Sequence, residues 1–211
     1  YCPDVDMEQA MRKENIELFS LETKKPIKEF DIIGFSLQYE LCFTNVLMML
    51  DLAGLPLLSK DRQNLQVLII AGGPVSSNPE PMSDYIDAFV LGDGEDVINE
   101  IIGIVGECKK QGAFRKQELL LRLAGIEGVY VPGFYDVEYK TDGSILKISK
   151  NNENVPDKIA KRTVDLSSSC HPVKPVVPYL EAVHDRFNAE VSRGCCNNCR
   201  FCQATNIYRP W

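Results

Sequence analysis

Val67-Leu68-Ile69-Ile70-Ala71-Gly72-Gly73-Pro74 carries the clearest fold signal in this chain. Five consecutive apolar residues that end in a glycine turn are typical of a strand covered on both faces, as in a parallel sheet. Similar apolar runs occur at 31–37 (DIIGFSL) and 88–91 (AFVL), and the second of these leads into the turn 92–95 (GDGE). We therefore predict three buried parallel strands, each followed by a turn or a helix.

Segments with helical periodicity separate these strands. Residues 41–53 predict a helix that ends at Gly54 and Pro56, with an inward side formed by Val46, Leu47, Leu50 and Leu52. Residues 95–110 predict a longer helix that buries Val97, Ile98, Ile101, Ile102 and Val105. The alternation of strands and helices predicts an α/β fold with a doubly wound, Rossmann-type parallel sheet.

Shorter elements are predicted on either side of this unit. Residues 6–15 favour a helix with Asp6 as its cap, and residues 116–124 favour another helix. The segments 134–139 and 145–149 flank turn-forming residues and predict a β-hairpin. The segment from Asn151 to Pro178 is rich in Asn, Ser and Pro and predicts an irregular linker.

The chain is therefore expected to have three parts. An α/β domain at 1–112 is incomplete at its N-terminus, and a helix, hairpin and linker module follows at 113–186. The last part, 187–211, opens with a predicted strand at Asn188–Ser192 and is truncated at its C-terminus. Because the chain starts at Tyr1 and ends nine residues after Cys202, we expect a fragment of a longer protein.

Composition narrows the function classes. The net charge of −7 disfavours binding to DNA and other polyanions. No apolar run approaches the roughly 20 residues needed to cross a bilayer, and no signal peptide is recognisable, so we expect a cytoplasmic protein without a membrane partner. Four of the eight cysteines lie within residues 195–202, which is too crowded for a disulfide framework and indicates metal ligation.

The pattern Cys195-x-x-x-Cys199-x-x-Cys202 places three thiols on one short loop, and Gly194 lets the backbone wrap around a metal centre. Three ligands leave one iron of a cluster open, as catalytic metal sites keep a vacant position. The alternative is a zinc-stabilised protein- or RNA-binding module without catalysis, with Cys196, Cys170 or His171 as the fourth ligand. Zinc sites more often pair two ligands and then two more, so the spacing favours iron and sulfur.

Residues 193–202 (RGCCNNCRFC) resemble the motif of radical S-adenosylmethionine (SAM) enzymes, including the aromatic residue before the last cysteine. The resemblance implies a [4Fe-4S] cluster on Cys195, Cys199 and Cys202, whose open iron binds SAM and whose electron yields a 5′-deoxyadenosyl radical. It places Phe201 beside the adenine and makes Cys196 a non-ligand. It also implies an external electron donor and a small-molecule, tRNA or protein substrate. Asn188–Ser192 would be the first strand of a (β/α) barrel, and the fragment is expected to be inactive alone.

The N-terminal part resembles the cobalamin-binding domain that precedes many radical SAM barrels, on GFSL (34–37), AGGP (71–74) and GDGE (92–95). Residues 30–95 resemble in particular an uncharacterised subfamily of such proteins. The resemblance implies a cobalamin (B12) edge lined by Ser36, Gly72, Gly73, Gly92 and Gly94.

Two features bear on that expectation. The Asp-x-His-x-x-Gly pattern of proteins with a lower axial histidine is absent, since the only histidines are His171 and His184. Cobalamin would then bind without histidine, or a missing segment would hold it, or the domain has lost it. Val97 stands where a dinucleotide fingerprint has its third glycine, which disfavours nicotinamide binding. For Glu95 we favour a role at a helix N-terminus over ligand contact.

Overall fold

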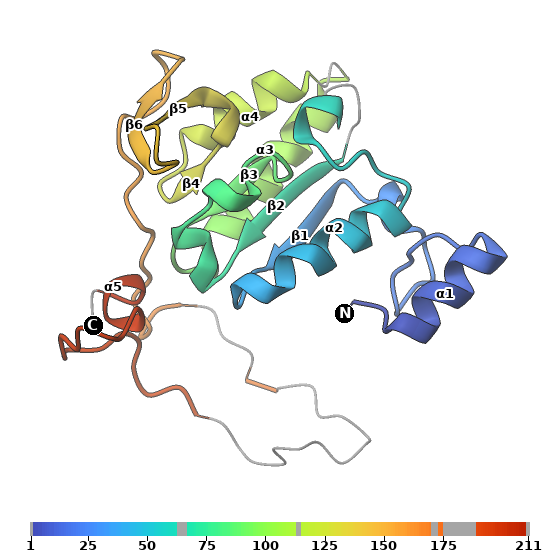
Figure 1. The fold of residues 1–211 in the computed structure, drawn as a ribbon, viewed down its shortest axis with the longest axis horizontal. Coiled ribbons are helices and arrows are strands. Elements are labelled where there is room, and N and C mark those ends of the chain that lie inside the picture. Colours follow the sequence, from blue (N-terminus) through green and yellow to red (C-terminus); the bar gives the residue numbers. More distant parts are fainter. Residues whose placement is uncertain (1, 63–66, 113–114, 170–172, 175–188, 210–211) are drawn as a thin grey trace.

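The computed structural model describes residues 2–62, 67–112, 115–169, 173–174 and 189–209. A four-stranded sheet forms its centre, with strands in chain order: β1 (Ile32–Ser36), β2 (Leu68–Gly72), β3 (Ala88–Val90) and β4 (Val129–Tyr130) (Figure 1). β1, β2 and β3 are parallel, which confirms the mixed α/β prediction with a parallel sheet. β4 pairs antiparallel with β3, so the prediction of a wholly parallel sheet is wrong there. A two-residue strand is too short to leave a periodic pattern.

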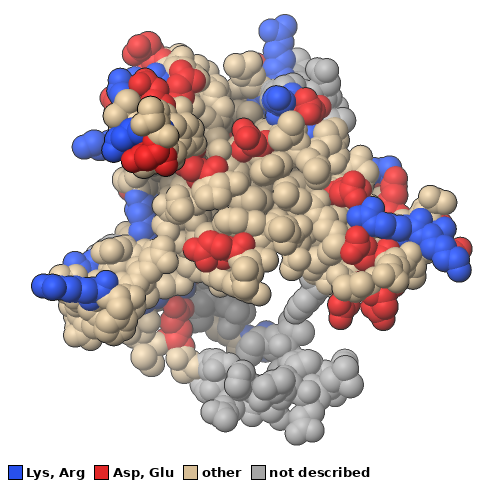
Figure 2. Space-filling view, in the orientation of Figure 1, with Lys and Arg blue, Asp and Glu red and all other residues tan. Residues whose placement is uncertain are grey.

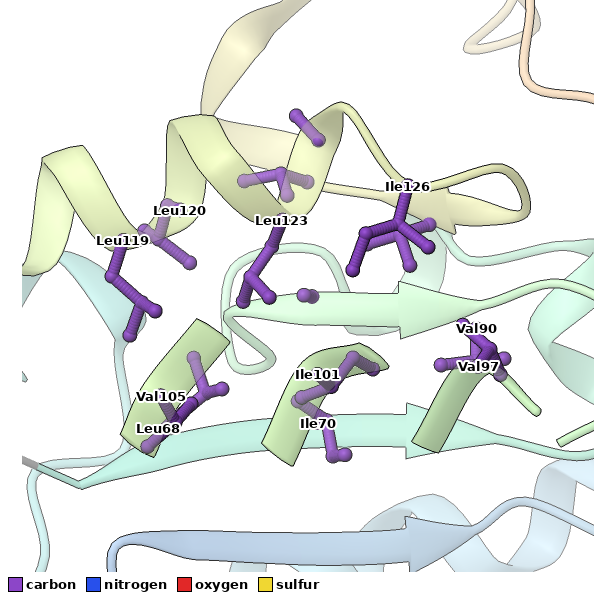
Figure 3. Packing of buried hydrophobic residues seen from close by; sticks show 14 of the residues in the cluster. Leu68, Ile70, Val90, Val97, Ile101, Val105, Leu119, Leu120, Leu123 and Ile126 are labelled. Atoms are coloured by element: carbon purple, nitrogen blue, oxygen red, sulfur yellow. The ribbon is translucent and has the colours of Figure 1, made fainter. Parts of the chain in front are cut away.

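Helices cover both faces of this sheet (Figure 1). α2 (Phe43–Leu52) packs on one face, and α3 (Val97–Lys110) and α4 (Lys116–Ala124) pack on the other. Successive β2 side chains alternate between the faces, since Leu68 and Ile70 contact the α3 side whereas Ile69 and Ala71 contact the α2 side. Figure 3 shows the aliphatic side chains of α3 and α4 gathered around β2 and β3.

The α3 helix corrects part of the sequence prediction. Val97, Ile101 and Val105 are buried, but Ile98 is 37% exposed and Ile102 is 53% exposed. Residues four apart stay on the stripe that faces the sheet, whereas each following residue is turned about 100° away from it. The predicted apolar face of this helix was therefore too wide.

The first helix, α1 (Val5–Glu14), begins earlier than expected. Asp4 is its N-cap and accepts a hydrogen bond from the backbone N–H of Val5, so the prediction of Asp6 as the cap is wrong by two residues. Single-turn 3-10 helices connect several elements, at Ile27–Glu29, Glu40–Cys42, Ser59–Arg62, Pro74–Ser77, Glu80–Met82 and Pro132–Phe134.

The predicted hairpin is present as a separate two-stranded sheet of β5 (Tyr135–Tyr139) and β6 (Ile145–Lys150). In the linker, residues 151–169 contain no helix or strand, but Arg162 forms an isolated parallel bridge with Gly92. Residues 170–172 and 175–178 of the predicted linker lie outside the described residues. The helix α4 packs into the same core as α3, and the division of the chain at residue 112 stays a prediction.

The predicted strand at Asn188–Ser192 is absent from its described residues, 189–192. Asn188 lies outside the described residues, and residues 189–192 are irregular. A strand requires a neighbour that takes up its hydrogen bonds, and no described strand lies beside these residues. A short helix, α5 (Ala204–Ile207), follows the cysteines. None of the described helices is both long and apolar enough to cross a bilayer.

Candidate functional site

A pocket of about 820 Å³ lies at the carboxyl ends of β1, β2 and β3. The carboxyl ends of neighbouring parallel strands meet at one edge of a sheet, where open α/β folds bind their ligands. All five residues that the sequence placed on this edge line the pocket, namely Ser36, Gly72, Gly73, Gly92 and Gly94. The structure thus brings together three loops that are far apart in the sequence.

The segment before the cysteines completes the pocket. Glu190, Ser192, Arg193 and Gly194 line it together with Tyr208 and the glycines at the strand ends. Gly194 has a positive φ of 85°, a conformation that favours glycine and turns the chain into the cysteine loop. The sequence analysis placed these residues in a separate part of the chain and missed their contact with the sheet.

Arg193 is the centre of this contact. Its guanidinium lies 3.3 Å from a carboxylate oxygen of Asp93, 2.5 Å from one of Glu95 and 2.7 Å from one of Glu190. The hydrogen bond from Arg193 lowers the pKa of Glu95 and that of Glu190. In turn, the carboxylates of Glu190 and Glu95 raise the pKa of Arg193, so this side chain stays positively charged. Glu95, which lies just before α3, therefore also has an ion-pair partner that the sequence analysis did not predict.

Two positive-φ glycines of the pocket, Gly92 and Gly73, are required by the packing of the chain itself. Gly92 has φ +106°, and a Cβ there would lie 2.0 Å from the carbonyl oxygen of Arg162. Gly73 has φ +97°, and a Cβ there would lie 2.8 Å from the carbonyl oxygen of Leu37. By contrast, no atom lies within 4 Å of a Cβ built at Gly94. Of these three glycines, only Gly94 therefore leaves free space for a ligand.

The pocket carries a negative charge on its described lining. The lining includes the carboxylates of Asp93, Glu95 and Glu190 against the single guanidinium of Arg193. Such a site disfavours a ligand with a net negative charge and suits a neutral or cationic ligand that donates hydrogen bonds. Figure 2 shows one face of the molecule, where Lys and Arg side chains are interspersed with Asp and Glu. His171 and His184 lie outside the described residues.

The cysteine loop follows the pocket directly. Cys195 and Cys202 are half-buried, whereas Cys196 and Cys199 are exposed, and Phe201 is 93% exposed. The Cys202 N–H donates to the Cys199 carbonyl at 3.1 Å, which places these two residues on one turn. Hydrogen bonds from the backbone N–H groups at the start of α5, chiefly that of Thr205, lower the pKa of Cys202.

These thiols are not gathered around one point. Within the part of the chain that the structure describes, no three His, Cys, Asp or Glu side chains lie close enough together to hold a metal ion. The chemistry of the donor set nevertheless fits an iron–sulfur cluster, because three accessible cysteines stand on one short loop that begins at a glycine. Cys170 and His171, which the zinc alternative would use, lie outside the described residues.

Residues 1–132 match the family described as "Radical SAM proteins, N-terminal". The chain belongs to this family. The prediction of the radical SAM superfamily is thereby confirmed at this level, and the match does not favour the zinc-binding alternative. An uncharacterised protein of Methanocaldococcus jannaschii is 28% identical to this radical SAM chain over 201 residues, which cover 93% of the chain and 35% of that protein. The chain thus spans about a third of the length of this curated relative. No solved structure matches it.

Proposed function

We propose that this chain carries the N-terminal domain and the cluster loop of a radical SAM enzyme. The observation that carries the proposal is the combination of the family match at 1–132 with the pattern Cys195-x-x-x-Cys199-x-x-Cys202 downstream of it. The three thiolates would each ligate one iron of a [4Fe-4S] cluster, and SAM would bind at the fourth iron. When bound, such a cluster supplies the electron that cleaves the carbon–sulfur bond of SAM.

Three residues near the cysteine ligands, Gly194, Phe201 and Cys196, have specific roles in this proposal. Gly194 gives the loop the positive φ with which it turns toward the cluster position. The exposed ring of Phe201 is available to pack beside the adenine of SAM. Cys196 is exposed next to a ligand and is assigned no iron. An external electron donor and a small-molecule, tRNA or protein substrate would act on the full-length enzyme.

Anaerobic reconstitution of the chain with iron and sulfide tests this proposal without any turnover. We expect about four irons per chain, broad visible absorption and the Mössbauer spectrum of a cubane cluster. Addition of SAM should change the electron paramagnetic resonance spectrum of the reduced cluster, because SAM binds the open iron. A colourless chain that holds a single zinc would contradict the proposal and favour the binding module.

A second candidate function concerns the pocket, which we propose as a cobalamin site. Its support is that Ser36, Gly72, Gly73, Gly92 and Gly94 line one cavity whose described acidic groups suit the amide groups at the corrin edge. The open space at Gly94 supplies room for a bulky ligand.

Gly94→Leu tests this second proposal by filling the pocket. After incubation with hydroxocobalamin and gel filtration, we expect the wild-type chain to retain corrinoid absorbance and Gly94→Leu to retain much less. Gly103→Leu is the matched control, because a Cβ at Gly103 also meets no atom within 4 Å but lies on α3 outside the pocket lining. Equal retention by both variants, or none by the wild type, would contradict cobalamin binding in this pocket.

A further inference from the structure

Both ends of the cysteine loop are fastened to other parts of the chain. On one side, Arg193 precedes the loop and pairs with Asp93 and Glu95 of the turn after β3. On the other side, the Lys161 ammonium donates to the carbonyl oxygen of Arg209 at 2.8 Å. The Arg209 guanidinium then reaches back across the loop and donates to the carbonyl oxygen of Asn197 at 3.2 Å.

Asp93 is the residue at which three segments of the chain meet. One carboxylate oxygen pairs with Arg193, and the other accepts the Val164 N–H of the linker at 3.1 Å. The Asp93 N–H donates to the carbonyl oxygen of Arg162 at 3.0 Å. The turn after β3, the linker and the segment before the cysteines are therefore joined through a single side chain and its backbone.

Burial distinguishes these ion pairs from ordinary surface pairs. The side chains of Arg193, Asp93 and Glu95 are 28%, 21% and 23% exposed, whereas Glu107 and Arg122, which pair between α3 and α4, are 61% and 36% exposed. Arg193 donates a charge-assisted hydrogen bond to Glu95 and forms an ion pair with Asp93. Two partly desolvated contacts from one planar guanidinium hold a defined geometry better than a single exposed pair does.

We propose that Asp93 and Glu95 are positioning residues, which hold the cysteine loop against the N-terminal sheet through Arg193. We call Arg193 with Asp93 and Glu95 the latch. The latch also forms a wall of the 820 Å³ pocket, because all three residues line it. The sheet thus sets where the cluster stands relative to a ligand in the pocket, a role that rests on the proposed radical SAM function.

Hydrogen–deuterium exchange of the metal-free chain tests the latch independently of any cluster. In Glu95→Gln and Arg193→Gln we expect the hydrogen-bonded amides at the end of the loop, those of Cys202 and of α5, to exchange at least about tenfold faster than in the wild type. Glu107→Gln is the matched control, since it removes an ion pair away from the loop, and should leave these amides unchanged. Exchange at β2 in the same samples shows whether each variant is folded.

The reduction potential of the reconstituted cluster provides the second readout. Glu95→Gln should bind the same amount of iron as the wild type but show a shifted potential and an altered spectrum with SAM, because the loop is held differently. Arg193→Lys, which keeps the charge without the planar fork, should lie between the wild type and Arg193→Gln in both measurements. Unchanged amide exchange together with an unchanged reduction potential in Glu95→Gln would overturn the proposal that the latch positions the cysteine loop. Absence of iron from the wild type would instead contradict the proposed function and leave the exchange result standing.

Discussion

Gly92 lies so close to Arg162 that a Cβ atom on its backbone would stand 2.0 Å from the Arg162 carbonyl oxygen. The two residues form a parallel β-bridge, and their neighbours Leu91 and Asp93 exchange backbone hydrogen bonds with Arg162 at 2.8 and 3.0 Å. The linker is thereby attached to the end of β3, next to the candidate site.

Gly92→Ala should therefore destabilise the chain. The positive φ and the contact with Arg162 both oppose a side chain, and we expect the free energy of unfolding in urea to fall by at least about 2 kcal/mol. Gly94→Ala, two residues away and without a close neighbour, should cost less than about 1 kcal/mol. Equal costs for the two substitutions would show that the linker does not pack as described.

The cysteines should differ sharply in their effect on iron binding. We expect Cys195→Ser, Cys199→Ser and Cys202→Ser each to lose most of the iron that the wild-type chain takes up anaerobically, because each removes one of three thiolate ligands. Cys196→Ser should keep the wild-type iron content. Iron and acid-labile sulfide analysis measures both effects, and loss of iron in Cys196→Ser would contradict the ligand assignment.

The buried Asp87 should be the most sensitive charged residue of the core. Its carboxylate is fully buried, 3.3 Å from the Arg62 guanidinium and 2.9 Å from the Lys116 ammonium, and it accepts the Ile69 N–H at 2.8 Å. Asp87→Ala would leave two buried cations without their counter-ion, so we expect a loss of about 3–5 kcal/mol in the free energy of unfolding. Glu107→Ala, which breaks only an exposed pair, should cost less than about 1 kcal/mol in the same urea titration.

Tyr130 should make the stability of the chain depend on alkaline pH. Burial, and then the hydrogen bond that its hydroxyl donates to Glu80 at 2.7 Å, raise the pKa of Tyr130 above its ordinary value of 10.0. Above pH 10 the unfolded chain loses this proton while the folded chain keeps it. The stabilisation is therefore complete below about pH 10 and falls at higher pH by up to about 1.4 kcal/mol per pH unit.

Tyr130→Phe tests this dependence. At pH 8 the variant should be less stable than the wild type by about 1 kcal/mol, because the hydrogen bond to Glu80 is lost. This difference should shrink as the pH rises from 9.5 to 11. A constant difference between Tyr130→Phe and the wild type would contradict the raised pKa.

Local sequence patterns predicted several elements well. The apolar runs at β1, β2 and β3 identified the parallel strands. β2 and β3 are buried as predicted, but β1 is only partly buried, so the prediction of a strand covered on both faces is wrong for this edge strand. Turn-forming residues between two strand-like segments identified the β5–β6 hairpin, because such residues favour the positive φ angles of tight turns. The predicted strand at 188–192 is absent from its described residues, 189–192. Apolar residues alone do not form a strand unless a neighbouring strand takes up their backbone hydrogen bonds.

The candidate site was less predictable. That Ser36 and the four glycines share one edge follows from the geometry of parallel strands and could be predicted. The pairing of Arg193 with Glu95 could not, because the two residues are 98 positions apart and no periodic pattern connects them. The acidic turn 92–95 and the arginine before the cysteine motif were the available signals, and neither alone identifies the other as its partner.

The amino-acid sequence alone specified the parallel α/β core and the spacing of the three cysteine thiols, because hydrophobic periodicity and ligand spacing are local properties of the chain. The folded structure was needed to show that Asp93 joins the turn after β3, the linker and the segment before the cysteines. Such contacts form only when segments that are distant in the sequence pack together. That packing depends on many interactions at once, and no short stretch of sequence contains them.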